Sequence, residues 1–152
     1  MNIKTTPNRA MMEQLLGRYL LISGEIDMFI SLSQSFFTGH PISKNWGKKD
    51  LADKLRWYGQ NLDLSVSEHA SLVGFITTVD VVHRPFRNML AHSTLTLDVE
   101  TNAFHAMNAN GLEESIAIET LYKKVQELEQ LNQDINGAIA LSASVHNKNK
   151  NA

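Results

Sequence analysis

The chain opens with a long helical pattern. Between about residues 8 and 37, apolar side chains recur at steps of three and four positions, which places them on one face of an α-helix. These positions are Leu15, Tyr19, Ile22, Ile26, Phe29, Ile30 and Phe36. Asn8 is a suitable N-cap for this helix. The sequence Thr38-Gly39-His40-Pro41 predicts its end, because glycine and proline stop helices.

Two further helices follow in the pattern. A short one is predicted from about Lys48 to Tyr58, with Leu51, Leu55 and Tyr58 on one side. A longer one is predicted over residues 66–83, where Ser65 and Glu68 have the spacing of a capping box. We expect this helix to bend or break before Pro85, because the residue preceding a proline is disfavoured in the helical conformation.

After this segment the spacing of the apolar residues changes from that of a helix to that of a strand. Alternation of apolar and polar residues over about 94–107 predicts a β-hairpin, which must lie on the helices because two strands alone are marginal. A final helix is predicted from about Glu113 to Leu141. Its apolar stripe is Ile118, Leu121, Val125, Leu128, Leu131, Ile135 and Ile139. The polar segment 146–152 is predicted to be disordered.

These elements predict an all-α fold, an up-down helical bundle with a small β-hairpin before the last long helix. Residues 1–145 are predicted to form a single domain, followed by the disordered tail 146–152. The long stripes of the first and last helices exceed what one core requires, so we expect a homodimer. No apolar run reaches membrane-spanning length and no signal peptide is apparent, which predicts a cytoplasmic protein without membrane contact.

Composition and charge exclude some kinds of site and some kinds of binding. The chain has no cysteine, which excludes disulfides and cysteine-based zinc sites. The net charge of −2 argues against broad, non-specific nucleic-acid binding, so any such contact must come from local patches. One stretch is locally basic: it contains Lys44, Lys48, Lys49, Lys54 and Arg56. It is either a solvated face or a track for an RNA backbone, and the sequence leaves both open.

The segment Arg87-Asn88-Met89-Leu90-Ala91-His92 carries the candidate chemistry. Pro85 favours a helix from about residue 85 to 92, because its backbone angle is already near the helical value. In that helix Asn88 and His92 share a face, whereas Arg87 and His92 are about 140° apart. Arg84 and His83 add positive charge next to them. A planar cation, an imidazole and an amide are the groups that a phosphate site requires.

This segment resembles the HEPN family, all-helical domains whose name stands for higher eukaryotes and prokaryotes nucleotide-binding. The family's hallmark is an arginine, often followed by a polar residue, then a histidine after a gap of four to six residues; here these are Arg87, Asn88 and His92. The resemblance implies a metal-independent endoribonuclease of toxin or defence type. In the reaction of such an enzyme, the RNA 2′-hydroxyl attacks the neighbouring phosphate at a dimer cleft. His92 would transfer protons, Arg87 would stabilise the phosphorane, and Asn88 would hold His92 or a phosphate oxygen.

The same resemblance implies substrate contacts and partners. We expect RNA to be bound by Arg84, His83, Lys48 and Lys49, with no cofactor. The alternative function is a non-catalytic dimer that binds RNA, a nucleotide or a protein, or that acts with an antitoxin or a nucleotidyltransferase partner.

Each candidate residue also has a structural interpretation. His92 could be a partly buried helix histidine. Arg87 could be ion-paired to Glu25 or Asp27. Asp80 and His83 could join His92 around a metal, but three scattered ligands do not favour this, and we expect no metal site.

Overall fold

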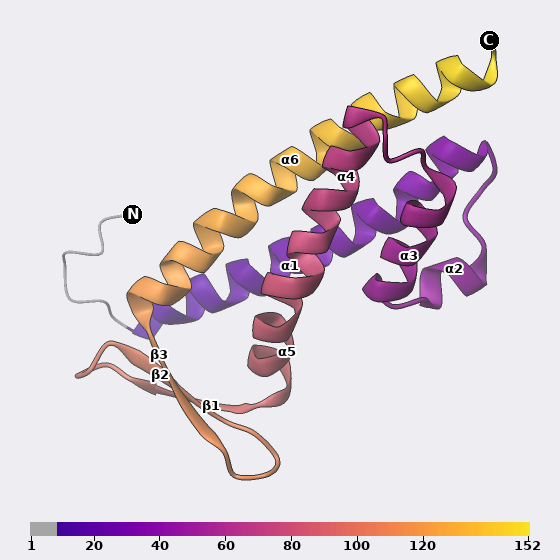
Figure 1. The fold of residues 1–152 in the computed structure, drawn as a ribbon. Coiled ribbons are helices and arrows are strands. Elements are labelled where there is room, and N and C mark those ends of the chain that lie inside the picture. The colour runs from indigo at the N-terminus through magenta and orange to yellow at the C-terminus, as the bar shows by residue number, and fades with distance from the viewer. Residues whose placement is uncertain (1–8) are drawn as a thin grey trace.

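The computed structural model describes residues 9–152, which fold into a mostly helical structure. Its two long helices, α1 (Arg9–Thr38) and α6 (Ile118–Lys150), lie side by side (Figure 1). They run in the same direction, because Asn132 Nδ2 lies 3.4 Å from Glu25 Oε2 and His146 Nε2 lies 3.1 Å from the Phe37 carbonyl further along both helices. The predicted helical class is confirmed. Although α1 and α6 have 30 and 33 residues, neither they nor any other described helix is apolar enough to cross a membrane.

The predicted apolar stripes form most of the core. All seven stripe positions of the last helix are buried, and so are five of those of the first: Leu15, Tyr19, Ile22, Ile26 and Ile30. Phe36, which we predicted to be in the stripe, is 55% exposed, and Phe37 takes the buried position. The predicted N-cap Asn8 lies outside the described residues.

The predicted short helix is present as α3, and a separate short helix precedes it. Helix α2 (Lys44–Lys48) begins after Ser43, whose hydroxyl accepts a hydrogen bond from Trp46 N at 3.1 Å. Helix α3 (Leu51–Asn61) begins after Asp50, whose carboxylate accepts one from Asp53 N at 2.8 Å. The helix that we predicted from about Lys48 therefore begins three residues later, because Asp50 is its N-cap.

We predicted a bend or a break before Pro85, and the chain does not break there. Helix α4 (Ser67–Thr78) continues through a π-helical turn, η1 (Val79–His83), into α5 (Arg84–His92). In this turn the Arg84 N–H donates to the Val79 carbonyl, five residues back. The wider turn lets the helix proceed past a proline that has no N–H to donate. The predicted capping box is also wrong, because Ser65 bonds to Asp63 and α4 has no side-chain cap.

A three-stranded antiparallel sheet replaces the predicted hairpin. Strands β1 (Thr94–Asp98) and β2 (Ala103–Met107) confirm the hairpin itself. The third strand, β3 (Glu113–Ala117), pairs with the other edge of β2 and occupies residues that we assigned to the last helix. Phe104 and Ile116 lie opposite each other in this pairing and are both buried. The added strand gives the hairpin the extra apolar contact that it needs for stability.

Helix α6 extends to Lys150, into the segment that we predicted to be disordered. Three side chains of this segment bond to carbonyls at the end of α1. Lys150 Nζ donates to the Phe37 carbonyl at 2.9 Å, Asn147 Nδ2 donates to the Phe36 carbonyl at 3.2 Å, and the His146 ring also contacts Phe37 O. These contacts satisfy carbonyl groups that α1 itself leaves without partners, so they hold the two helix ends together.

Candidate functional site

A pocket of about 480 Å³ lies between α1, the α2–α3 region and the junction of η1 with α5. We call it the basic pocket. Its lining residues are Ser23, Asp27, Met28, Ser31, Gly47, Lys49, Asp50, Leu51, Lys54, Val79, His83, Arg84, Arg87 and Asn88. A pocket of this volume is in the range of small-molecule and nucleotide sites, roughly 300–1,000 Å³.

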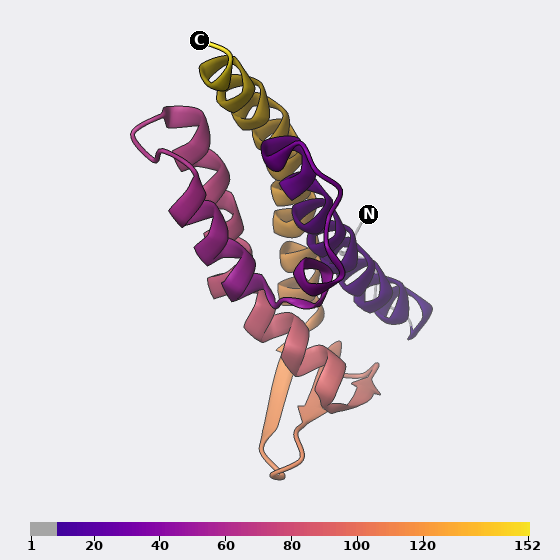
Figure 2. The same ribbon diagram turned by 90° about the vertical axis from the view of Figure 1, so that its right-hand side faces the viewer.

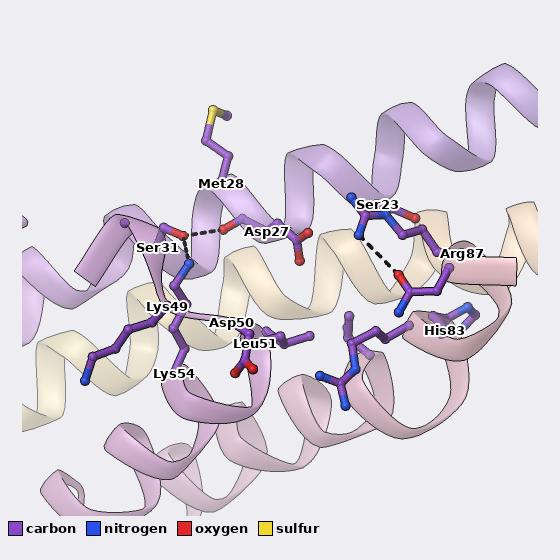
Figure 3. Close-up of a pocket in the computed structure, with 14 residues that line it drawn as sticks. Ser23, Asp27, Met28, Ser31, Lys49, Asp50, Leu51, Lys54, His83 and Arg87 are labelled. Atoms are coloured by element: carbon purple, nitrogen blue, oxygen red, sulfur yellow. Dashed lines mark hydrogen bonds between the residues drawn. The ribbon is translucent and has the colours of Figure 1, made fainter. Parts of the chain in front are cut away.

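Positive charge exceeds negative charge in the basic pocket. Its cations are Lys49, Lys54, Arg84 and Arg87, and its carboxylates are Asp27 and Asp50. Figure 3 shows Lys54 beside Ser31 at one end, Arg87 and His83 at the other, and the Asp27 carboxylate projecting between them. The pocket is therefore a local cationic concavity on a chain whose net charge is −2, and it favours anionic ligands.

Arg87 is held loosely in this pocket. Its Nη1 donates to Asn88 Oδ1 at 3.5 Å, the long limit of a hydrogen bond. Among the described side chains, neither Glu25 nor Asp27 forms an ion pair with it, and Glu25 instead contacts Asn132. Burial raises the pKa of Asp27, while the positive charges of Arg87 and Lys54 act to lower it. The guanidinium thus keeps most of its donors for a ligand.

Lys54 differs from the solvated cation that the basic stretch suggested. It is only 7% exposed, its Nζ donates to Ser31 Oγ at 2.7 Å, and it lies 5.9 Å from the centre of the Trp46 ring. It shares the buried face of α3 with Tyr58, four residues on. That four-residue step is the signal in the sequence that could have identified Lys54 as a pocket residue.

His83 forms part of the pocket wall and is 3% exposed. Its Nδ1 lies 3.0 Å from the Tyr19 hydroxyl, which also donates to the His83 carbonyl at 3.3 Å. Burial lowers the pKa of His83; Lys124 lowers it further, and Glu127 opposes the shift. Burial likewise raises the pKa of Tyr19. Both groups are therefore neutral near pH 7.

The structure separates the two ends of the predicted motif. Arg87 and Asn88 line the basic pocket together with Arg84, His83 and Lys49. His92 lies outside it and is exposed at the end of α5; Lys48 is also outside the pocket lining. Within residues 9–152 no hydrogen bond or ion pair engages the His92 ring.

The residues that we considered as metal ligands do not converge. Asp80 Oδ1 lies 3.0 Å from Arg84 Nε, His83 contacts Tyr19, and His92 is exposed. No group of three or more metal-ligating side chains is present in the described part of the chain.

Protein-family models, curated proteins and solved structures contain no match to this chain. The resemblance to the HEPN family therefore stays a prediction, based on Arg87, Asn88 and His92.

Proposed function

We propose that the protein binds RNA and that Arg87 holds a phosphate group of the RNA in the basic pocket. The observation that supports this proposal is that two of the motif residues line the basic pocket. Arg87 and Asn88 open onto one pocket that also contains Arg84, Lys49 and Lys54. A planar guanidinium with free donors matches two phosphate oxygens, and nearby ammonium groups add charge without demanding a fixed geometry.

The carboxylates of the pocket suit the sugar rather than the phosphate. Asp27 projects between the two cationic ends (Figure 3), where it is placed to accept hydrogen bonds from ribose hydroxyls. Burial of Lys54 strengthens its attraction for an anion, because less water screens the charge. The pocket thus offers acceptors for hydroxyl groups beside donors for phosphate, the combination that a ribonucleotide presents.

A second candidate function is RNA cleavage by Arg87 and His92, as the motif implies. Because His92 is exposed and is turned away from the pocket, it would act with Arg87 of a second copy in a homodimer. Such an enzyme would be metal-independent and of toxin or defence type. An antitoxin or a nucleotidyltransferase would then be the regulatory partner.

The test compares two arginine variants in binding to a fluorescently labelled single-stranded RNA, measured by anisotropy over a range of salt concentrations. Arg87→Ala should weaken binding at least about tenfold and reduce the salt slope by about one. Arg56→Ala is the matched control, because Arg56 lies on α3 outside the pocket and pairs with Asp53 at 2.8 Å. Equal binding by native protein and Arg87→Ala, or an equal loss in Arg56→Ala, would contradict the proposal.

A further inference from the structure

Lys54 places a buried positive charge in the wall of the basic pocket. The residue is only 7% exposed, yet none of the ion pairs among the described side chains includes it. Its Nζ donates to Ser31 Oγ at 2.7 Å and lies 5.9 Å from the centre of the Trp46 ring. Both partners are uncharged, whereas a buried ammonium group is normally paired with an anion. The charge of Lys54 is therefore available to an anionic group of a ligand.

The carboxylates of the basic pocket do not neutralise this charge. Asp50 is the N-cap of α3, and its carboxylate accepts a hydrogen bond from Asp53 N at 2.8 Å. The charges of Arg87 and Lys54 both act on Asp27, but Asp27 forms an ion pair with neither. Since these carboxylates leave Lys54 unpaired, the pocket keeps an excess of positive charge.

The order of the charged groups along the pocket matches one end of an RNA chain. Figure 3 shows Lys54 at one end of the pocket, Arg87 at the other, and the Asp27 carboxylate between them. In a terminal nucleotide that carries an end phosphate, the ribose likewise lies between two phosphate groups. One is the end phosphate, and the other joins the next nucleotide. The 2′-hydroxyl of that ribose can donate a hydrogen bond to a carboxylate such as Asp27.

The burial of Lys54 favours an end phosphate over a phosphate within the chain. An internal phosphodiester has a nucleoside on each side, so the strand would have to enter and leave past a residue that is only 7% exposed. An end phosphate needs a path on one side only. It also carries a charge of about −1.5 to −2 near pH 7, whereas an internal phosphodiester carries a single charge. A buried ammonium group without a counterion therefore suits the end phosphate better.

We propose that the basic pocket binds the phosphorylated end of an RNA chain and that Lys54 contacts the end phosphate, an inference that rests on the proposed RNA binding. Lys54 Nζ donates to the oxygens of the phosphomonoester, and Arg87 donates to the adjoining phosphodiester. Asp27 accepts a hydrogen bond from the ribose between them. A 5′-phosphate and a 3′-phosphate both satisfy this arrangement, because each end has a ribose between its two phosphate groups.

The test compares three single-stranded RNAs of one sequence, each with a fluorescent label on an internal base. One has hydroxyl groups at both ends, one carries a 5′-phosphate, and one carries a 3′-phosphate. Anisotropy should show that native protein binds one of the phosphorylated RNAs at least about tenfold more tightly than the hydroxyl-ended RNA, because charged hydrogen bonds to the end phosphate are added. The RNA that binds more tightly identifies the end that the pocket recognises.

Two lysine variants locate the contact. Lys54→Met should bind the preferred RNA and the hydroxyl-ended RNA with affinities within about twofold of each other. Lys49→Met is the matched control, because Lys49 lines the same pocket but is exposed. It should weaken the binding of every RNA and keep the preference for the phosphorylated end. An equal loss of the preference in both variants, or its loss in Lys49→Met alone, would overturn the role of Lys54.

The binding of native protein separates this inference from the proposed function. If native protein binds none of the three RNAs, the proposed function fails. If it binds all three with equal affinity, RNA binding stands and the recognition of a phosphorylated end is wrong.

Native protein also supplies a measurement that does not depend on how well a variant folds. A phosphomonoester loses its second proton near pH 6, whereas a phosphodiester has no proton to lose in this range. The ratio of the two affinities, for phosphorylated and for hydroxyl-ended RNA, should therefore rise between about pH 5 and about pH 7.5. A ratio that stays constant over this range would contradict a contact between Lys54 and the end phosphate.

Discussion

Replacement of Tyr19 by phenylalanine would remove one buried hydroxyl that has two partners. Tyr19 is fully buried in α1, and its hydroxyl contacts both Nδ1 and the carbonyl of His83. Its ring packs edge-on against Phe86, with 5.1 Å between the ring centres, and phenylalanine keeps that contact. The change therefore isolates the hydrogen bonds that orient His83 from the packing of α1 against α5.

The cost follows from the groups that lose their partner. A buried polar group left without a hydrogen bond destabilises a protein by about 1–3 kcal/mol. We expect the free energy of unfolding to fall by about 2 kcal/mol, because the His83 ring is buried and its Nδ1 has no other partner in the described residues. For a chain of this size, such a loss lowers the melting temperature by roughly 4–8 °C.

Urea unfolding monitored by circular dichroism measures the change. At a slope of about 2 kcal/mol per M, the midpoint should move down by about 1 M. Tyr122→Phe is the matched control, because the Tyr122 hydroxyl has only an exposed contact, at 3.4 Å, from Gln126 Nε2. Its effect should stay within about 0.5 kcal/mol. Equal stability of the two variants would refute the assignment of the Tyr19–His83 pair.

Two other changes test the pocket and the two histidines whose pKa is lowered. Lys54→Met should weaken RNA binding at least about fivefold, because the pocket loses one positive charge. The free energy of unfolding should fall by less than about 1 kcal/mol, because methionine fills the buried space without a desolvated charge. A large loss of stability in urea, or unchanged anisotropy on RNA addition, would contradict this. The free energy of unfolding should decrease on acidification from pH 6.5 to about 5, because burial lowers the pKa of His83 and of His146, so the unfolded chain binds protons that the folded chain does not. Urea titrations across this range would show a constant or rising stability if the two rings were not buried as neutral groups.

The long helices were predictable because their periodicity extends over many turns. Each turn of α1 and α6 repeats the same apolar signal, and both helices pack through that stripe. Their ends were less predictable. Residues 146–150 look disordered in composition, but they are helical because they bond to carbonyls at the end of α1, a contact between residues about 110 positions apart.

The predictions for the middle of the chain were wrong for a similar reason, because contacts with distant parts of the chain decide the structure there. Glu113 and Glu114 suit a helix N-terminus, yet they lie in β3, because the free edge of β2 offers hydrogen bonds that only a partner strand can make. The π-helical turn was missed because Pro85 predicts a break from local geometry alone. Contacts of α4 with α6 and of α5 with α1 hold both segments on the long helices.

The candidate site was predicted in part. The cluster of Arg84, Arg87 and Asn88 followed from short spacings on one helix, which local geometry fixes. The pocket itself depends on α1 and α3, so Asp27 and Lys54 could not be joined to that cluster from sequence spacing. That His83 lines the pocket while His92 does not likewise depends on which face of the helix is turned toward α1. Figure 2 shows the helical segment of α4 and α5 leading to the sheet, and His92, its last residue, is not among the residues that line the pocket.

An NMR titration of uniformly ¹⁵N-labelled protein with a short single-stranded RNA would test the central claim most directly. RNA binding in the basic pocket predicts that the amide signals of residues 83, 84 and 86–88, together with those of Ser31 and Lys54, shift on titration while the signal of His92 does not. Shifts confined to His92 and the sheet, or no shifts at millimolar RNA, would contradict the account.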